Sequence, residues 1–379
     1  LAVLATAEQK LSVVPQPVRS EAEPLDYAVL PQLADVVDRA IFARAYATSY
    51  GGDDTVDNMV AGDSQTITAG QNGTVNTMSG GKQDISSGGT GTVSTMNSGG
   101  QNIFDGTGTV STIRDGEQEI YGGTGTVSTV KTDGNQNIYG GTGIINTMEG
   151  GYQFTQGGTA IIGTMSSGQQ TINRGDTGTI SAMISGVQLI YSNGNGTVST
   201  MSGGEQQIKN GAMGTVSTMS GGLQLVDDGG TGTVSTMSGG SQKVYSGANG
   251  TISTMSAGEQ QIKSGGTGTV STMSGGQQYM SSGGTGTVST MLGGLQIISS
   301  GGSGTVSTMS GGNQAIDGGT GTVSTMSGGV QSILGGTGTI ITMNSGSHNI
   351  NGGTGIVSTM SGGKQSISGG TGMIDTMFG

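Results

Sequence analysis

The sequence predicts an all-β protein: a single-stranded parallel β-helix, or β-solenoid, of about 18 coils with 17–18 residues each. The first observation is a phrase, T-G-T-V-S-T-M-S-G-G-x-Q-x-I, that recurs from about residue 60 to the end of the chain. The second is its period. After a first step of 19 residues, the anchor methionines, or the Ile and Val that replace them, lie 17 or 18 residues apart, which is too short for two helices. The third is the strict register of β-branched residues, which disordered Gly- and Ser-rich chains do not keep.

Two files of apolar residues predict the strands of each coil. With positions numbered from the anchor methionine, position −3 is Val or Ile in all eighteen coils from Val75 onward, and position +7 is Ile in nearly every coil. Such residues suit a buried, pleated strand. One strand is therefore expected around T-V-S-T-M and another around x-Q-x-I, with Gly-Gly corners that supply positive φ values. The residue that the short coils lack usually falls just after position +7, in a turn.

Position +5 is Gln in nearly every coil and shares a strand face with position +7. Amides stacked one coil apart can hydrogen-bond along the axis, which predicts an interior amide ladder; a stripe that reads a ligand is the alternative. Its representative members are Gln206, Gln224, Gln242, Gln260, Gln278 and Gln296. His348, the single His of the chain, replaces Gln at one step, and we interpret it as a ladder defect rather than a metal ligand or a base.

The anchor methionine lies three residues after position −3, so strict alternation would put the two on opposite faces of the strand. Either the chain bends between them and both point inward, or the methionines form an exposed apolar stripe. We expect methionine to lie inside at a corner, because its flexible side chain fills irregular core space.

Residues 1–50 differ from the repeat domain, residues 51–379, because all four Pro lie before residue 50 and all 80 Gly and 20 Met lie after it. Apolar residues from Leu33 to Ile41 follow helical spacing behind Pro31, which predicts a short helical N-terminal segment. This segment is either a cap over the first coil or a docking element for a partner or a neighbouring subunit.

Each end of the chain leaves two explanations open. The first residues, Leu1-Ala-Val-Leu-Ala, lack a basic region, so either a signal peptide has been removed or the chain begins inside a longer precursor. The chain stops two residues past Met377 without a closing repeat. Truncation of a longer protein and head-to-tail stacking of rods into a filament both explain that end.

Composition and motifs argue against several classes of function. The net charge of −12 argues against nucleic acid as a partner, and no run of 18 apolar residues predicts a transmembrane helix. The chain has no Cys, which excludes disulfides and thiolate metal sites. No catalytic motif is found, and the repeat lacks the Asp of calcium-binding nonapeptides, so we expect no enzyme activity, no cofactor and no metal.

A T-G-T motif precedes the core Val in many coils, as at Thr267 and Thr269. Ordered Thr files on a flat solenoid face could bind ice, which is a minor alternative function. Asn195, Met213 and Asn249 interrupt one file, and Ile144, Ile161 and Ile356 interrupt the other.

The phrase T-V-S-T-M-S-G-G-x-Q-x-I-x-S-G-G-T resembles the passenger (stalk) repeat of AIDA-type autotransporter adhesins, including TibA-like glycosylated adhesins, over roughly residues 51–379. The resemblance implies a bacterial surface β-helix, usually right-handed, that mediates adhesion or autoaggregation. It also implies O-glycosylation of Ser and Thr by a dedicated glycosyltransferase. The candidate acceptors, at positions −2 and +1, are Ser94, Ser217, Ser235, Ser271, Ser220, Ser238 and Ser274. The family's translocator barrel and signal peptide are not found in this chain.

The sequence thus favours a non-enzymatic adhesin stalk, located outside the cell or on the outer surface of a bacterium. Its expected partners are a second copy of itself, a glycosyltransferase, and a host or bacterial surface. A self-assembling extracellular filament subunit is the alternative from another class.

Overall fold

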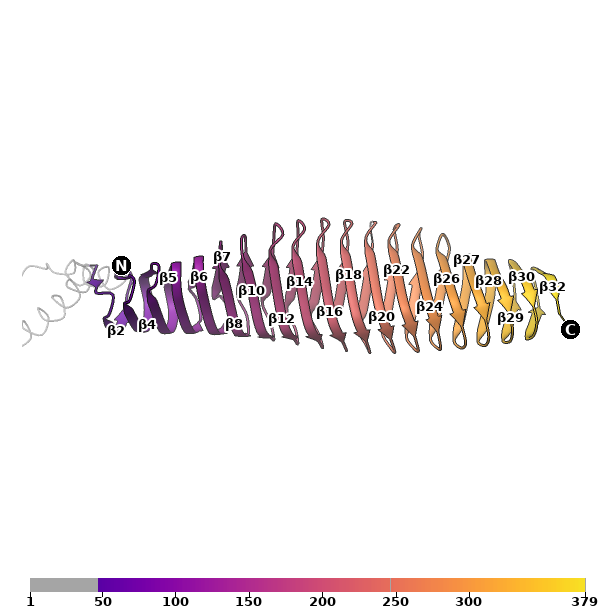
Figure 1. The fold of residues 1–379 in the computed structure, drawn as a ribbon, viewed down its shortest axis with the longest axis horizontal. Coiled ribbons are helices and arrows are strands. Elements are labelled where there is room, and N and C mark those ends of the chain that lie inside the picture. Colours follow the sequence, from indigo (N-terminus) through magenta and orange to yellow (C-terminus); the bar gives the residue numbers. More distant parts are fainter. Residues whose placement is uncertain (1–46, 246, 379) are drawn as a thin grey trace, which may run out of the picture. The chain divides into compact units, whose positions relative to one another are not determined.

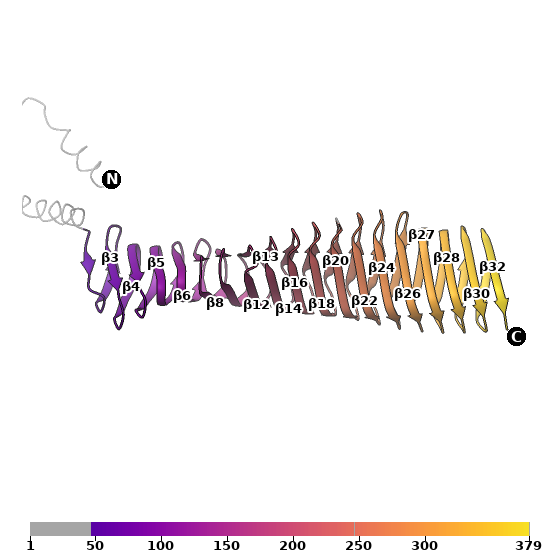
Figure 2. The ribbon, with the colours of Figure 1, turned by 45° about the horizontal axis from the view of Figure 1, so that its top comes forward.

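The computed structural model describes residues 47–245 and 247–378. These residues form 32 β-strands that pair in parallel, and they contain no helix. The expected fold is confirmed: the chain is a parallel β-solenoid of about 18 coils. Figures 1 and 2 show the coils following one another along a single axis, from β2 at the indigo end to β32 at the yellow end. The helix expected before residue 46 lies outside the described residues, and handedness stays an expectation.

Each coil contributes a long strand and a short strand. The long strands, which carry T-V-S-T-M or its equivalent, are β2 (Thr55–Met59), β8 (Thr142–Met148), β10 (Thr159–Met165), β12 (Thr177–Met183), β14 (Asn195–Met201), β16 (Met213–Met219), β18 (Thr231–Met237), β20 (Asn249–Met255), β22 (Thr267–Met273), β24 (Thr285–Met291), β26 (Ser303–Met309), β30 (Thr354–Met360) and β32 (Thr371–Met377). The short strands, most of which carry x-Q-x-I, are β1 (Ser49–Tyr50), β3 (Ser64–Ile67), β7 (Asn135–Ile138), β9 (Tyr152–Thr155), β11 (Gln169–Ile172), β13 (Val187–Ile190), β15 (Glu205–Ile208), β17 (Leu223–Val226), β19 (Ser241–Val244), β21 (Glu259–Ile262), β23 (Gln277–Met280), β25 (Leu295–Ser299), β29 (Ser347–Ile350) and β31 (Lys364–Ile367). The strands that join both kinds are β4 (Asn72–Ile85), β5 (Thr90–Ile113), β6 (Glu117–Val130), β27 (Asn313–Met326) and β28 (Val330–Met343).

Equivalent positions of successive coils pair with each other. Val198 of β14 pairs with Val216 of β16, and Gln206 of β15 pairs with Gln224 of β17. Successive parallel strands lie about 4.8 Å apart, so the repeat period in sequence becomes a repeat along the rod axis. Each side chain therefore stacks on its own equivalent, which produces continuous files of identical residues.

The anchor methionines lie in the core together with the Val and Ile of position −3, and both files are fully buried through most of the rod. The register explains how residues three apart point the same way. Val198 pairs with Val216 and Thr200 with Thr218, but the serine between them is omitted from the ladder. The chain bends at that serine, so the interior alternative holds and no exposed methionine stripe forms.

The glycine of T-G-T packs directly against the inward side chains of the short strand, the Gln of position +5 and the Ile of position +7. Gly214 is buried, and a β-carbon added there would collide with the side chains of Ile208 and Gln206. The long and short strands approach so closely at this point that only hydrogen fits between them. This glycine is required for packing and not for a positive φ value.

Coil length varies mainly at the corner between the short strand and the next long strand. In long coils a tight turn occupies this corner; Asp228 and Gly229 have φ values of 49° and 74°, and Gly230 N donates to Asp227 O at 2.9 Å. In some short coils the strand continues through the corner, as in β27 and β28, whereas in others, as between β29 and β30, three residues separate the two strands. The turns of the middle coils accordingly project further than the corners near the ends of the rod (Figure 1).

Candidate functional site

The glutamines of position +5 form a continuous hydrogen-bonded ladder inside the rod. From Gln83 to Gln331, each Nε2 donates to Oε1 of the glutamine one coil earlier, at 2.6–2.8 Å. Most also donate their second N–H to a glycine carbonyl, as Gln224 does to Gly214 at 3.3 Å. The members are fully buried. The six glutamines singled out from the sequence all lie in this ladder, and their polar atoms are occupied by their neighbours.

Two ladder members were not found by counting from the anchor. Gln65 and Gln136 lie at position +6, because their coils carry one more residue in the corner after the anchor. Gln136 donates to Gln118 and accepts from Gln153, both at 2.7 Å, so it continues the ladder. The signal was present in the sequence, since Ile67 and Ile138 are displaced by the same single residue.

His348 interrupts the ladder. It is fully buried and lies in register between Gln331 and Gln365, whose Nε2 is 3.2 Å from His348 Nδ1. On the other side, Gln331 Oε1 and His348 Nε2 are buried without a hydrogen-bond partner. Burial lowers the pKa of His348 to about 4, because the charged imidazolium loses its hydration.

The substitution His348→Gln is expected to raise the free energy of unfolding by about 1–2 kcal/mol, because the new amide can donate to Gln331 Oε1. It should also change the response to acid. The unfolded chain protonates an imidazole near pH 6.5, whereas in the folded state His348 has a pKa of about 4. The natural protein therefore loses stability as the pH falls from about 6.5 to about 4, and the variant lacks this loss.

Urea unfolding at pH 7.5 and at pH 4.5 measures both effects. Asn349→Gln, on the adjacent half-buried position, is the matched control and should leave stability and its pH dependence unchanged. Equal acid sensitivity in His348→Gln and the natural protein would contradict this account of His348.

The candidate acceptor serines all lie on the exterior. Each of Ser94, Ser217, Ser220, Ser235, Ser238, Ser271 and Ser274 is exposed. The serines at position −2 occupy the bend that the strand ladder omits, as the pairing of β16 with β18 illustrates. Those at position +1 donate a long hydrogen bond to the methionine carbonyl of the preceding coil, for example Ser220 to Met201 at 3.4 Å. Two hydroxyl files therefore flank the buried methionines along the rod.

The two Thr files of T-G-T also face outward, in register from coil to coil, as Thr267 with Thr285 and Thr269 with Thr287. The interruptions expected from the sequence are found in the same rows: Asn195 pairs with Met213, and Ile144 with Ile161. Met213 is exposed. Ice binding by this face stays a prediction.

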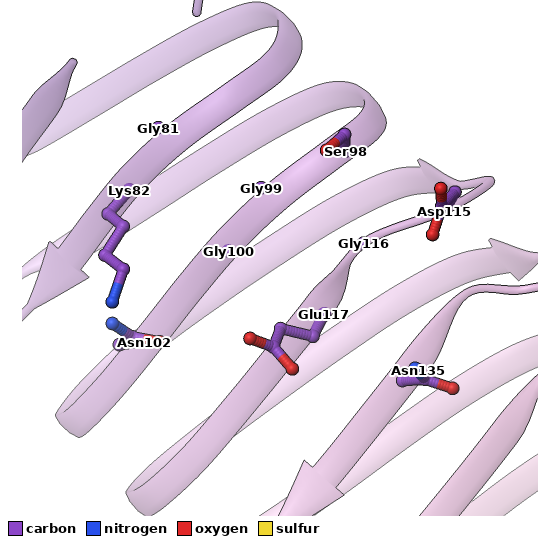
Figure 3. Close-up of a pocket in the computed structure, with 10 residues that line it drawn as sticks. All are labelled: Gly81, Lys82, Ser98, Gly99, Gly100, Asn102, Asp115, Gly116, Glu117 and Asn135. Carbon is purple, nitrogen blue, oxygen red and sulfur yellow. The ribbon is translucent and has the colours of Figure 1, made fainter. Parts of the chain in front are cut away.

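Polar hollows lie at the corner that follows the anchor residues in the N-terminal coils. The first, of about 310 Å³, is lined by Gly81, Lys82, Ser98, Gly99, Gly100, Asn102, Asp115, Gly116, Glu117 and Asn135. Figure 3 shows Lys82 and Glu117 on either side of the bare backbone of Gly100. The second, of about 360 Å³, is lined by Thr132, Asp133, Glu149, Gly150, Gly151, Tyr152, Ser167, Gly168 and Gln169. Sequence reasoning missed both, because they arise between coils.

Three exposed aromatic residues form a stack on neighbouring coils. The ring centroids of Phe104 and Tyr121 are 5.2 Å apart, and those of Tyr121 and Tyr139 are 5.1 Å apart. The Tyr121 hydroxyl donates to Glu119 Oε2 at 3.1 Å. Partial burial, followed by the hydrogen bond and the charge of Glu119, raises the pKa of Tyr121. The rings cover one another's faces, so the stack mainly stabilises this part of the rod.

Within residues 47–245 and 247–378, no group of three or more His, Cys, Asp or Glu side chains could hold a metal ion. No helix in the same residues is long and apolar enough to cross a membrane. Comparison of the chain with protein-family models, curated proteins and solved structures finds no match.

Proposed function

We propose that this chain is a non-enzymatic adhesin stalk on the outer surface of a bacterium, where it mediates adhesion or autoaggregation and carries O-linked sugars on its outward serines. The observation that carries the proposal is the regular exposure of serine at position −2, where the chain bends out of the strand ladder. A sugar attached there removes no ladder hydrogen bond. The sequence resemblance to AIDA-type passenger repeats points the same way.

The packing of the interior supports this assignment, because it leaves only the outer side chains available to a partner. The Gln ladder and the Val, Met and Ile files use the inward side chains for stacking, so a partner can meet only the outer files. Those files repeat at about 4.8 Å along the axis. When two rods lie side by side, or when one rod lies along a surface, a weak contact made by one coil is repeated by every coil. The repetition raises avidity although no single site binds strongly. The expected partners are a second copy of the chain, a glycosyltransferase, and a host or bacterial surface.

Display of the chain on bacterial cells tests the proposal, with the glycosyltransferase of the native host supplied. Cells that display it should settle faster than cells without it and bind more firmly to host cells. Replacement by alanine of every serine at positions −2 and +1, the seven candidates included, should remove most of this gain. Replacement of the same serines by threonine is the matched control, since it keeps the hydroxyl groups, and it should preserve the gain. Settling and adhesion no greater than those of cells without the chain would contradict the proposal.

A further inference from the structure

The two polar hollows adjoin at the same corner of neighbouring coils, and we call them together the corner groove. The first hollow ends at Asn135, and the second begins at Thr132 and Asp133 of the same corner. From Gly81 to Gly168 the corner recurs over five coil steps, which corresponds to about 24 Å along the axis. The groove is therefore much longer than a single small-molecule site.

The floor of the groove is backbone. A β-carbon at Gly150 or Gly151 would collide with backbone atoms of the preceding coil, so these positions must stay bare. Gly100 is different, because a β-carbon there would lie 3.7 Å from Glu117 Cγ, an ordinary contact distance. Neighbouring coils carry Lys82 and Glu117 at the paired positions, so the first hollow is the volume of an absent side chain (Figure 3).

The walls carry groups that hydrogen-bond to hydroxyls. Lys82 supplies an ammonium, Asp115 and Glu117 supply carboxylates, and Asn135 has a buried Oδ1 without a partner. Partial burial and the nearby charge of Glu119 raise the pKa of Glu117, despite the opposing effect of Lys82. A carboxylate that is incompletely solvated gains from a hydroxyl donor more than one in open water does.

The second hollow adds an aromatic surface. The Tyr152 side chain is 53% exposed and lies beside Glu149, Asp133 and the amide of Gln169. Its ring combines an apolar body with a polar tip. A sugar ring has the same two-sided character, since its C–H groups form an apolar face and its hydroxyls surround the edge.

We propose that the corner groove binds a neutral oligosaccharide, lying along the rod axis with hydroxyl pairs on the carboxylates and amides and one ring on Tyr152. The proposal deepens the adhesin function and rests on it. The polar lining disfavours an apolar peptide, which needs hydrophobic anchors. Asp115, Glu117 and Asp133 outnumber Lys82 even when Glu149, which forms an ion pair with Lys131, is left out of the count, and this disfavours sulfated or phosphorylated chains. A length of several sugar rings fits a groove that crosses five coil steps.

The test uses the whole purified chain on an array of immobilised neutral, amino-substituted and sulfated oligosaccharides, followed by titration with the neutral chain that binds best. Two variants address the two hollows: Gly100→Gln fills the first, and Tyr152→Ala removes the aromatic surface of the second. Their matched controls are Ser241→Gln, at the same position of a coil outside the groove, and Tyr245→Ala, a partly exposed tyrosine elsewhere. Each groove variant should weaken binding about tenfold or more, the loss of one good contact, while each control should leave it within about twofold.

Circular dichroism and the urea midpoint of unfolding are expected to be unchanged in all four variants. A difference in affinity then reports on binding and not on folding. No binding of any neutral oligosaccharide, preference for sulfated chains, or equal binding by groove variants and controls would each overturn the proposal. The adhesin proposal is separable: if purified protein binds neutral oligosaccharides but displaying cells neither settle nor adhere, the groove stands and the adhesin function fails. If cells settle through the serine files while the array stays empty, the groove alone fails.

Discussion

Replacing Gln206 with leucine is expected to lower the local free energy of unfolding by about 3–6 kcal/mol, because three hydrogen bonds in the interior are lost and no water can replace them. Gln206 Nε2 donates to Gln188 Oε1 at 2.7 Å and to Gly196 O at 3.4 Å, and Gln206 Oε1 accepts from Gln224 at 2.7 Å. Leucine fills the space but can form none of these hydrogen bonds. In a stacked array each coil contacts only its neighbours, so the loss should be confined to the adjacent coils.

Hydrogen exchange measured by mass spectrometry shows whether the loss of stability is confined to the adjacent coils. Amides of β14, β15 and β16 should exchange much faster in Gln206→Leu, while those of β28 should not change. Gln207→Leu is the matched control, since Gln207 is the next residue of β15 and is half-buried on the outer face. Similar exchange rates in the two variants would show that the ladder contributes no more than a surface amide.

Gly214→Val is expected to destabilise the same coil by about 3 kcal/mol through overpacking, although valine favours β-strands more than glycine does. The new β-carbon collides with Ile208 and with Gln206 Oε1, and both residues are fully buried and stacked on their equivalents in the neighbouring coils. Strand propensity and packing therefore predict opposite signs at this position. The sign of the measured change in the free energy of unfolding therefore shows which of the two effects is larger.

Thr215→Val is the matched control, because Thr215 follows in the same strand and is half-buried on the outer face. It should change the free energy of unfolding by less than about 0.5 kcal/mol, the usual range for surface positions. Urea unfolding followed by circular dichroism measures both variants. Stabilisation by Gly214→Val would contradict the close packing of this glycine against the short strand.

The fold was predictable because each coil repeats the same alternation of inward and outward residues. Val216 and Ile208 belong to the two most regular files, and Gln206 lies two residues before Ile208 on the same strand. Their common inward face follows from strand geometry alone. The inward position of the methionine does not follow from strand alternation, because it depends on a bend at the serine of position −2. The pairing register of β14 and β16 reveals that bend.

What the sequence did not reveal depends on distances between coils. The role of Gly214 follows from the approach of two strands, and glycine is too frequent in this chain for one position to stand out. The corner groove depends on Gly100 lying between Lys82 and Glu117, which are 18 and 17 residues away. Gln136 was missed because an extra corner residue shifted it from the expected position.

The central claim is that the interior serves stacking alone and the outward serines carry the function. Peptide mapping by mass spectrometry of the chain purified from its native host tests it most directly. The account predicts sugar mass increments on peptides that contain Ser217, Ser220, Ser235 and Ser238, all of which are exposed. A chain whose intact mass matches the unmodified sequence, with every one of these peptides unmodified, would contradict it.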